Sequence, residues 1–361
     1  MAKINKGKIG VFCDGLMHWH NTINNRQMPW KGEKDPYKIW LSEIILQQTR
    51  VEQGRAYYEK FIRHYPTVEH LANANDDDVF KLWEGLGYYS RCKNLLHTAR
   101  NIVQQFNGQF PNTYEEIIQL KGIGPYTAAA IASFAFNLPH AVVDGNVYRV
   151  LARYFGIDTP SDTTEGKKLF TSLAQGCIDS NNPALYNQAI MDFGATVCTP
   201  ANVQCHNCSL KNGCAAFAKN LVAILPVKVK QLQKKDRWFT YFIIEKDGQV
   251  LIGKRTGKDI WQNLYEFFLT ESLVETNWTK ANISTHLKNE LGINSTTSNI
   301  SEIFTQKLTH QTIFARFIQV KVKSAFTPPE GFIFHPSAKL STLPFPKTIT
   351  AFLDKGFAAT T

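Results

Sequence analysis

Hydrophobic residues recur every three or four positions along most of the first 220 residues, a spacing that places them on one face of an α-helix. Few runs in this part alternate with the two-residue period of a strand. Loop-forming residues interrupt the helical pattern at Pro36, residues 73–78, Pro111, Pro139 and Pro160. The pattern therefore predicts an all-α domain.

The pattern changes after Pro226, where a basic, glutamine-rich stretch begins. Runs with strand character, rich in β-branched and aromatic side chains, follow at residues 238–244, 250–253 and 314–322. One helical pattern lies among them, at residues 278–291. We therefore predict a multidomain chain with an all-α domain over residues 1–220, a basic linker over residues 221–236 and a smaller α+β domain over residues 237–361.

The composition of the 361-residue chain allows a packed core, because 43% of its residues are hydrophobic and only 19% are charged. No apolar run approaches the 18 residues of a membrane span, and the apolar piece at residues 9–13 is too short for a signal peptide. We expect a cytoplasmic protein with no membrane partner, associated with the nucleoid if DNA is its partner. The net charge of +10 suits an anionic partner, and residues 221–361 hold +7 of it.

Four of the seven cysteines lie within 17 residues, which favours a metal site in a reducing compartment over a disulfide framework. They are Cys198, Cys205, Cys208 and Cys214. Four thiolates at this spacing can surround Zn²⁺ or hold an iron–sulfur cluster. Zinc ribbons usually contain two C-x2-C pairs and this chain has one, so the spacing favours iron–sulfur and leaves zinc open.

A glycine-rich turn joins two helical patterns at residues 113–120 and 125–136. Gly122 and Gly124 permit a tight turn, and Pro125 suits the first turn of the helix that follows. The free N–H groups at that helix start can bind a phosphate. The same residues would also serve an ordinary helix–turn–helix connection.

Glu43 occurs in an apolar helical segment. Its neighbours at three and four residues are Ile39, Trp40, Leu46 and Gln47. A glutamate on a helix is normally solvated, but here it would lie within an apolar stripe. Because burial raises the pKa of a carboxyl group, Glu43 is a candidate proton donor at neutral pH.

Asp144 directly precedes a predicted helix, a position typical of an ordinary N-cap. The helix N-terminus also favours the ionised carboxylate. One acid kept protonated and one kept ionised form the arrangement that cleaves a glycosidic bond. Glu43 and Asp144 together therefore indicate glycosidic chemistry.

These motifs together resemble the helix-hairpin-helix DNA glycosylases that carry an iron–sulfur cluster, and within them the MutY-type adenine DNA glycosylases. The matching segments are residues 28–31, 43–51, 83–91, 120–128, 142–153 and 188–198. The resemblance implies a monomer that binds double-stranded DNA, with a [4Fe–4S] cluster on the four clustered cysteines.

The resemblance also implies a reaction, the excision of adenine mispaired with 8-oxoguanine, and also with guanine, after the adenine is flipped out of the duplex. Glu43 would protonate the departing adenine at N7, and Asp144 would stabilise the cationic sugar by its charge or through a covalent intermediate. Tyr126 and Asn146 would orient the sugar and Asp144. Residues expected in the adenine pocket are Arg26, Trp30 and Gln188. Residues expected to contact DNA or the oxidised guanine are Gln48, Thr49, Leu86, Tyr88, Lys121, Gly122 and Gly124.

Two other classes compete with this interpretation of the helical domain. The endonuclease III type shares the hairpin and the cluster but carries a catalytic lysine where this chain has Tyr126. Strand cleavage by a lyase needs an amine nucleophile, so we predict a monofunctional glycosylase. A non-catalytic DNA-binding protein would keep the hairpin and the basic linker but would need neither Glu43 nor Asp144.

The C-terminal part, residues 237–361, resembles a Nudix domain. A working Nudix box has Arg-Glu and then Glu-Glu shortly before a glycine, but residues 285–292 keep only Glu290 and Gly292. This predicts that Mg²⁺-dependent nucleotide hydrolysis is lost. In the family, a Phe-Ser-His loop of this domain reads the oxidised guanine. Here Thr309 keeps the hydroxyl, so we expect Thr309 and His310 to contact the lesion.

Overall fold

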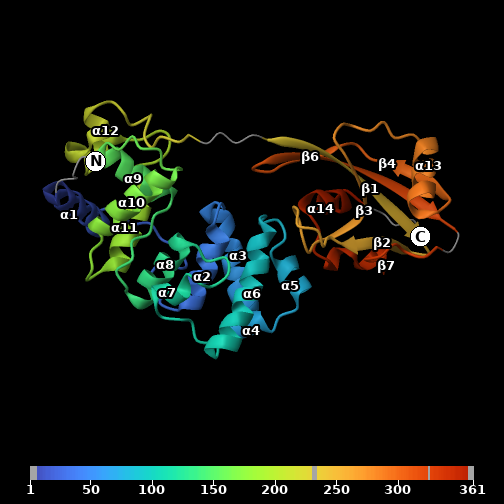
Figure 1. Ribbon diagram of the computed structural model, residues 1–361, viewed down its shortest axis with the longest axis horizontal. Helices are drawn as coiled ribbons and strands as arrows, with labels where there is room; N and C mark the ends of the chain where they lie inside the picture. Colours follow the sequence, from blue (N-terminus) through green and yellow to red (C-terminus); the bar gives the residue numbers. More distant parts are fainter. Residues whose placement is uncertain (1–5, 230–233, 324–325, 357–361) are drawn as a thin grey trace. The chain divides into compact units, whose positions relative to one another are not determined.

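The computed structural model describes residues 6–229, 234–323 and 326–356 (Figure 1). By its internal contacts the chain forms two compact units. Unit 1 consists of Met1–Asn73 and Asn94–Lys230, and unit 2 consists of Ala74–Lys93 and Gln231–Thr361. Residues 74–93 are thus grouped with unit 2, although the sequence places them inside the all-α domain. The domain boundaries inferred from the sequence stay a prediction.

The described part of unit 1 contains helices and loops, in agreement with the all-α prediction. Its elements are α1 (Lys6–Thr22), α2 (Pro36–Leu46), α3 (Val51–His64), α4 (Val68–Ala72), α7 (Tyr114–Ile117), α8 (Pro125–Phe136), α9 (Gly145–Phe155), α10 (Thr164–Cys177), α11 (Pro183–Thr196), η1 (Cys205–Asn207), η2 (Lys211–Gly213) and α12 (Ala215–Ala218). Helix α6 (Tyr89–Phe106) begins in unit 2 and continues into unit 1. Within the described ranges, no helix is both long and apolar enough to cross a membrane.

One hydrophobic core of unit 1 joins α1, α9 and α11. Phe12 and Leu16 of α1 and Leu151 of α9 are fully buried in it. Trp19 packs edge-to-face against Phe193 of α11, with ring centroids 5.0 Å apart. This packing holds α9 and α11 in place, and these two helices carry several of the predicted site residues.

Helix α8 approaches α2 closely because its side chains are small. Residues 128–132 are four alanines and one isoleucine, and all of them are buried. Helix α2 contacts α8. It starts at Pro36, after Asp35 accepts a hydrogen bond from Tyr37 N at 2.9 Å. The two helices therefore pack against each other, and this contact determines where Glu43 lies.

Unit 2 is built on a seven-stranded mixed sheet with the order β4-β6-β1-β3-β2-β7, in which β5 pairs with β6. Its strands are β1 (Lys235–Lys246), β2 (Gln249–Lys254), β3 (Tyr265–Ser272), β4 (Ser295–Ile300), β5 (Phe304–Lys307), β6 (Gln311–Val322) and β7 (Phe332–Pro336). Its helices are α5 (Asp76–Leu82), α13 (Lys280–Leu291), η3 (Ser337–Thr342) and α14 (Lys347–Asp354). Strands β1 and β6 run parallel, and the other pairs are antiparallel.

Helices cover both faces of this sheet. Because side chains alternate along a strand, Phe242 and Ile318 share one face, where Ile283 and Leu287 of α13 pack on them. Phe317 points to the other face and stacks on Phe352 of α14 at 4.2 Å. The predicted α+β second domain is therefore confirmed.

Candidate active site

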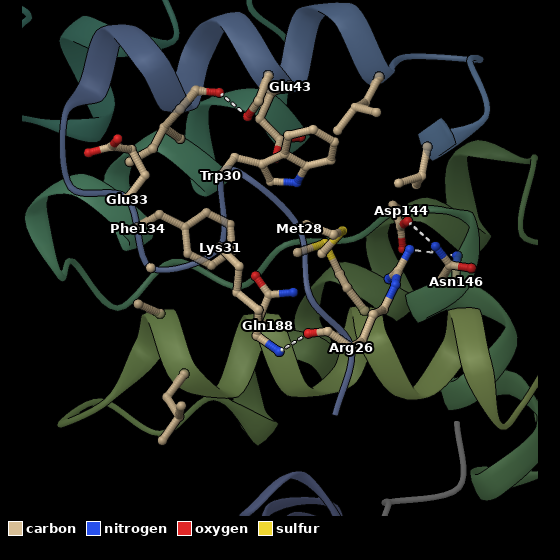
Figure 2. A pocket seen from close by; sticks show the side chains of 18 of the residues that line it. Arg26, Met28, Trp30, Lys31, Glu33, Glu43, Phe134, Asp144, Asn146 and Gln188 are labelled. Atoms are coloured by element: carbon tan, nitrogen blue, oxygen red, sulfur yellow. Dashed lines mark hydrogen bonds between the residues drawn. The ribbon is translucent and has the colours of Figure 1, made fainter. Parts of the chain in front are cut away.

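A cavity of about 520 Å³ opens in unit 1, of the size that suits a small-molecule group such as a base (Figure 2). Its walls come from α2, the loop before it, α8, the start of α9 and α11. Eight residues nominated from the sequence line it: Arg26, Trp30, Glu43, Thr49, Tyr126, Asp144, Asn146 and Gln188. The fold thus brings together residues that are up to 162 positions apart in the chain.

Glu43 reaches this cavity from the buried face of α2 and is only 8% exposed. Burial raises the pKa of its carboxyl group to about 7. A hydrogen bond with Tyr126 opposes this shift, and the negative charge of Asp144 adds to it. A carboxyl group with this pKa is still substantially protonated at neutral pH, which is what a proton donor requires.

Asp144 caps α9 and is held by three hydrogen bonds. One carboxylate oxygen accepts from Asn146 N at 2.9 Å and from Val147 N at 2.8 Å, and the other accepts from Asn146 Nδ2 at 2.7 Å. The expected helix-end contacts are present, yet burial raises the pKa of Asp144, against these bonds and the charge of Arg149. The net pKa of Asp144 is thus raised, although the helix end favours the ionised form. Donors on both oxygens still suit the carboxylate form.

Asn146 is held in place by Arg149, a residue that sequence reasoning missed. Arg149 Nη2 donates to Asn146 Oδ1 at 2.8 Å and to Gly194 O at 2.6 Å, and Arg149 Nε donates to Cys198 O at 2.6 Å. These bonds turn the amide group so that Nδ2 faces Asp144. The side chain of Asn146 is thus held against the Asp144 carboxylate.

The predicted adenine-pocket residues also meet in this cavity. Arg26, Trp30 and Gln188 line it together, and Trp30 packs edge-to-face on Tyr58 at 5.4 Å. Figure 2 shows Gln188 and Arg26 on the side of the cavity opposite Glu43. Sequence reasoning missed Asp192, a fully buried carboxylate paired with Arg26 at 2.9 Å. Its signal in the sequence is its position four residues after Gln188, on the same face of α11.

A second cavity, of about 490 Å³, lies in unit 2. Among its lining residues are four of the predicted lesion contacts: Leu86, Tyr88, Thr309 and His310. The hydroxyl groups of Tyr88 and Thr309 form a hydrogen bond. Tyr88 is 39% exposed and has a left-handed backbone with φ of 49°. A non-glycine residue held in this conformation is a common feature of functional sites.

Gln48 and Thr49 belong to unit 1 and follow α2 directly. Gln48 is exposed, and its backbone is also left-handed, with φ of 58°. Thr49 lines the cavity that holds Glu43.

The predicted hairpin joins α7 to α8. Gly122 has φ of +81°, and a Cβ there would come within 2.7 Å of Asn94 Cβ, so the turn requires glycine. Thr98 Oγ1 donates to Lys121 O at 2.8 Å and holds the turn. Gly124 is the N-cap of α8 and provides no side-chain cap, which leaves the first N–H groups available to a ligand.

The four clustered cysteines line one small apolar cavity between the end of α11 and α12. Within the described residues, no three His, Cys, Asp or Glu side chains converge on a point that would hold a single metal ion. Arg153 Nη1 donates to Cys198 Sγ at 3.5 Å. Four cysteine side chains around one cavity are the donor set that an iron–sulfur cluster uses.

Comparisons with known proteins agree with this fold. A profile described as "HhH-GPD superfamily base excision DNA repair protein" matches residues 41–175, and a NUDIX domain profile matches residues 240–355. The chain is thus a helix-hairpin-helix base-excision repair protein with a Nudix-type second domain. It is 36% identical over 309 residues to an adenine DNA glycosylase of Buchnera aphidicola subsp. Baizongia pistaciae, an alignment that covers 84% of each chain. The chain belongs to the adenine DNA glycosylase family.

Two further similarities concern the helical part. The human adenine DNA glycosylase is 40% identical over 219 residues, covering 58% of this chain and 40% of the human protein. A solved structure of a thermostable thymine-DNA glycosylase is 29% identical and superposes with a TM-score of 0.55, covering 59% of this chain and 98% of that one. A DNA complex of endonuclease III superposes with a TM-score of 0.53 at 18% identity, which shows a shared fold.

Proposed function

We propose that this chain excises adenine paired with 8-oxoguanine, and also with guanine, from double-stranded DNA by hydrolysing the N-glycosidic bond. The family supports adenine removal in base excision repair. The observation that carries the chemistry is the pair of carboxyl groups in one cavity. Glu43 is buried with a raised pKa, and Asp144 accepts three hydrogen bonds. One group is suited to donate a proton and the other to remain an anion.

In the proposed reaction, the flipped adenine enters the cavity between Trp30 and Gln188. Glu43 donates its proton to N7 while the C1′–N9 bond breaks, and the bonding electrons leave with the base. Asp144 stabilises the cationic sugar. A water molecule then adds at C1′ and loses one proton to the Glu43 carboxylate, which restores the acid and completes the hydrolysis. Asn146 keeps the carboxylate of Asp144 in place, and Tyr126 lies against Glu43.

We also propose that residues of unit 2 contact the oxidised guanine. The cavity in unit 2 supports it, because it combines the apolar side chain of Leu86 with the linked hydroxyl groups of Tyr88 and Thr309. His310 adds a polar ring beside them. Tyr88 would act as the wedge that fills the gap left by the flipped base. In unit 1, Gln48 and Thr49 are further proposed DNA contacts.

DNA binding and the cluster complete the proposal. The exposed hairpin at Lys121, Gly122 and Gly124 would bind a backbone phosphate through the free N–H groups of α8. The four cysteines would hold a [4Fe–4S] cluster, which we expect to stabilise the end of unit 1. Purified protein should then contain four iron and four sulfide per chain, and zinc in place of iron after anaerobic purification would contradict this assignment.

A strand-cleaving lyase is the second candidate, because two amines, Lys31 and Lys34, line the cavity. Lys34 Nζ donates to Phe134 O at 3.1 Å. Lys31 Nζ, however, is bound by Asp192 at 3.1 Å and by Arg26 O at 2.9 Å. An ammonium group held in an ion pair is a poor nucleophile. Borohydride should therefore trap no covalent complex between the protein and DNA.

A single-turnover assay tests the proposed function. Duplexes would carry adenine opposite 8-oxoguanine, guanine or thymine, and alkali would convert abasic product into strand breaks. We expect breaks for the first two duplexes after alkali and none before it. Breaks without alkali would favour the lyase, and intact strands in every duplex would contradict the proposal.

A further inference from the structure

Next to the cavity that holds Glu43 lies a carboxylate that the proposed reaction does not use. Asp192 on α11 is fully buried, at 0% exposure. Its Oδ1 accepts from Arg26 Nη1 at 2.9 Å, and its Oδ2 lies 3.1 Å from Lys31 Nζ. An uncompensated buried charge is strongly unfavourable, so the anion and the two cations hold each other in place.

The two cations face the cavity, where Figure 2 shows them beside Gln188. Each has a side chain that is 22–23% exposed. Lys31 Nζ also donates to Arg26 O at 2.9 Å, so the loop is folded back on itself. Both side chains are long and would otherwise sample many rotamers.

Asn24 also forms a hydrogen bond with Asp192. Its Oδ1 accepts from Arg26 N at 3.1 Å, which fixes the orientation of the amide group. Its Nδ2 then donates to Asp192 Oδ2 at 2.9 Å and to His20 Nδ1 at 3.0 Å. Asp192 is therefore the one acceptor shared by Asn24, Arg26 and Lys31.

We propose that Asp192 is a positioning residue for base recognition: it fixes Arg26 and Lys31 in the cavity wall before the adenine arrives. This inference rests on the proposed function. Helix α11 then supplies two sets of contacts, Gln188 directly and the two cations through Asp192. Side chains that are already ordered lose less conformational entropy when the base binds, which strengthens binding and improves alignment for cleavage.

The first test measures the reactivity of Lys31 and needs no turnover. The full chain and an Asp192→Asn variant would be acetylated with an activated ester, and the labelling of Lys31 would be compared by mass spectrometry with that of Lys34 in the same loop. We expect the ratio of Lys31 to Lys34 labelling to rise several-fold in the variant, because Lys31 has lost its anionic partner. An unchanged ratio in folded protein overturns the inference.

The second test is a double-mutant cycle on the single-turnover rate of adenine release. Asp192→Asn should slow release about 10- to 100-fold, since small misplacements of this kind have effects of that order. In a chain that already carries Arg26→Met and Lys31→Met, the same change should cost less than about twofold. Equal factors in both backgrounds would mean that Asp192 acts only on stability, and would overturn the proposal. Asp14→Asn, on the exposed face of α1, is the matched control and should leave the rate unchanged.

A charge-matched variant covers the case in which Asp192→Asn does not fold. Asp192→Asn combined with Lys31→Gln removes one anion and one cation together. It should release adenine more slowly than Lys31→Gln alone, because Arg26 has also lost its fixed partner; equal rates would overturn the inference. Failure of the unchanged chain to release adenine would count against the proposed function alone, since the labelling ratio is measured without catalysis.

Discussion

Two carboxyl groups, one from each unit of this chain, differ in whether a cation accompanies them. In unit 1, Glu43 is buried without a cationic partner among the causes of its shift, and its pKa rises to about 7. In unit 2, Asp259 is exposed and pairs with an arginine. Arg237 contacts Asp259 at 2.7 Å and Glu271 at 2.6 Å, and Arg237 lowers the pKa of Asp259. A buried carboxyl group without a cationic partner can exchange its proton near neutral pH. A carboxyl group paired with an arginine stays ionised and serves as part of an ion pair.

The helix of the Nudix-type box in unit 2 also differs from a catalytic site that is rich in carboxylates. In place of a set of carboxylates, α13 presents His286, whose Nε2 lies 2.8 Å from Thr270 Oγ1 and whose ring stacks on Phe242. The described residues of unit 2 contain no group of three side chains suited to a metal ion. The helix of the box thus packs on the sheet through His286.

The largest expected effect is on the rate. Glu43→Gln keeps the size of the side chain but removes the acidic proton, so adenine release in single-turnover assays should fall by about 10²–10⁴. Duplex binding, measured by fluorescence anisotropy, should persist. Glu59→Gln, an exposed glutamate on α3, is the control and should release adenine normally. Near-normal release by Glu43→Gln would show that unit 1 does not hold the proton donor.

The same acid should make the protein less stable at high pH. Its pKa is raised above the ordinary 4.5, so the folded state binds the proton more tightly than the unfolded state does. Below pH 4.5 the raised pKa costs the folded state no stability. The loss in the free energy of unfolding grows as the pH rises to about 7, above which it stays at about 3 kcal/mol. Glu43→Gln should therefore raise the free energy of unfolding at pH 8 but not at pH 4, as measured by urea denaturation. Equal gains at both pH values would contradict the raised pKa.

A smaller effect is expected in the cavity of unit 2. Thr309→Ala removes the hydroxyl group bound to Tyr88, and a side-chain hydrogen bond contributes about 0.5–1.5 kcal/mol. The preference for 8-oxoguanine over guanine opposite adenine should fall by no more than about tenfold, while release from the guanine mispair stays unchanged. Thr305→Ala, an exposed threonine on β5, is the matched control. A preference that survives intact in Thr309→Ala would remove Thr309 from the proposed lesion contacts.

The smallest effect is expected at the remnant of the Nudix box. Glu290 is exposed near the end of α13, and among the residues that the structure describes it belongs to no group of carboxylates suited to a metal. Glu290→Gln should leave adenine release unchanged. The unchanged chain should show no Mg²⁺-dependent hydrolysis of oxidised nucleoside triphosphates, measured as pyrophosphate release. Hydrolysis that Glu290→Gln abolishes would restore unit 2 as a second catalytic centre.

Local sequence was informative wherever a residue's surroundings come from its own segment. The apolar flanks of Glu43 predicted its burial, and the position of Asp144 before a helix predicted its cap. The strand runs at residues 238–244, 250–253 and 314–322 fall within β1, β2 and β6, whose side chains are mostly buried. Such segments carry the hydrophobic period that defines them.

Tertiary structure decided what depends on distant partners. Strand β4 has the sequence Ser-Thr-Thr-Ser-Asn-Ile, which lacks an apolar face, and it is a strand because it pairs with β6 at the edge of the sheet. Asp192 lies in an apolar helix, and its cations come from Arg26 and Lys31, more than 160 positions earlier. The net shift of Asp144 likewise depends on how deeply the fold buries it. The chain's own pattern determines helices, caps and strands because those forces act between near neighbours, whereas charge compensation depends on which remote segments the fold brings into contact.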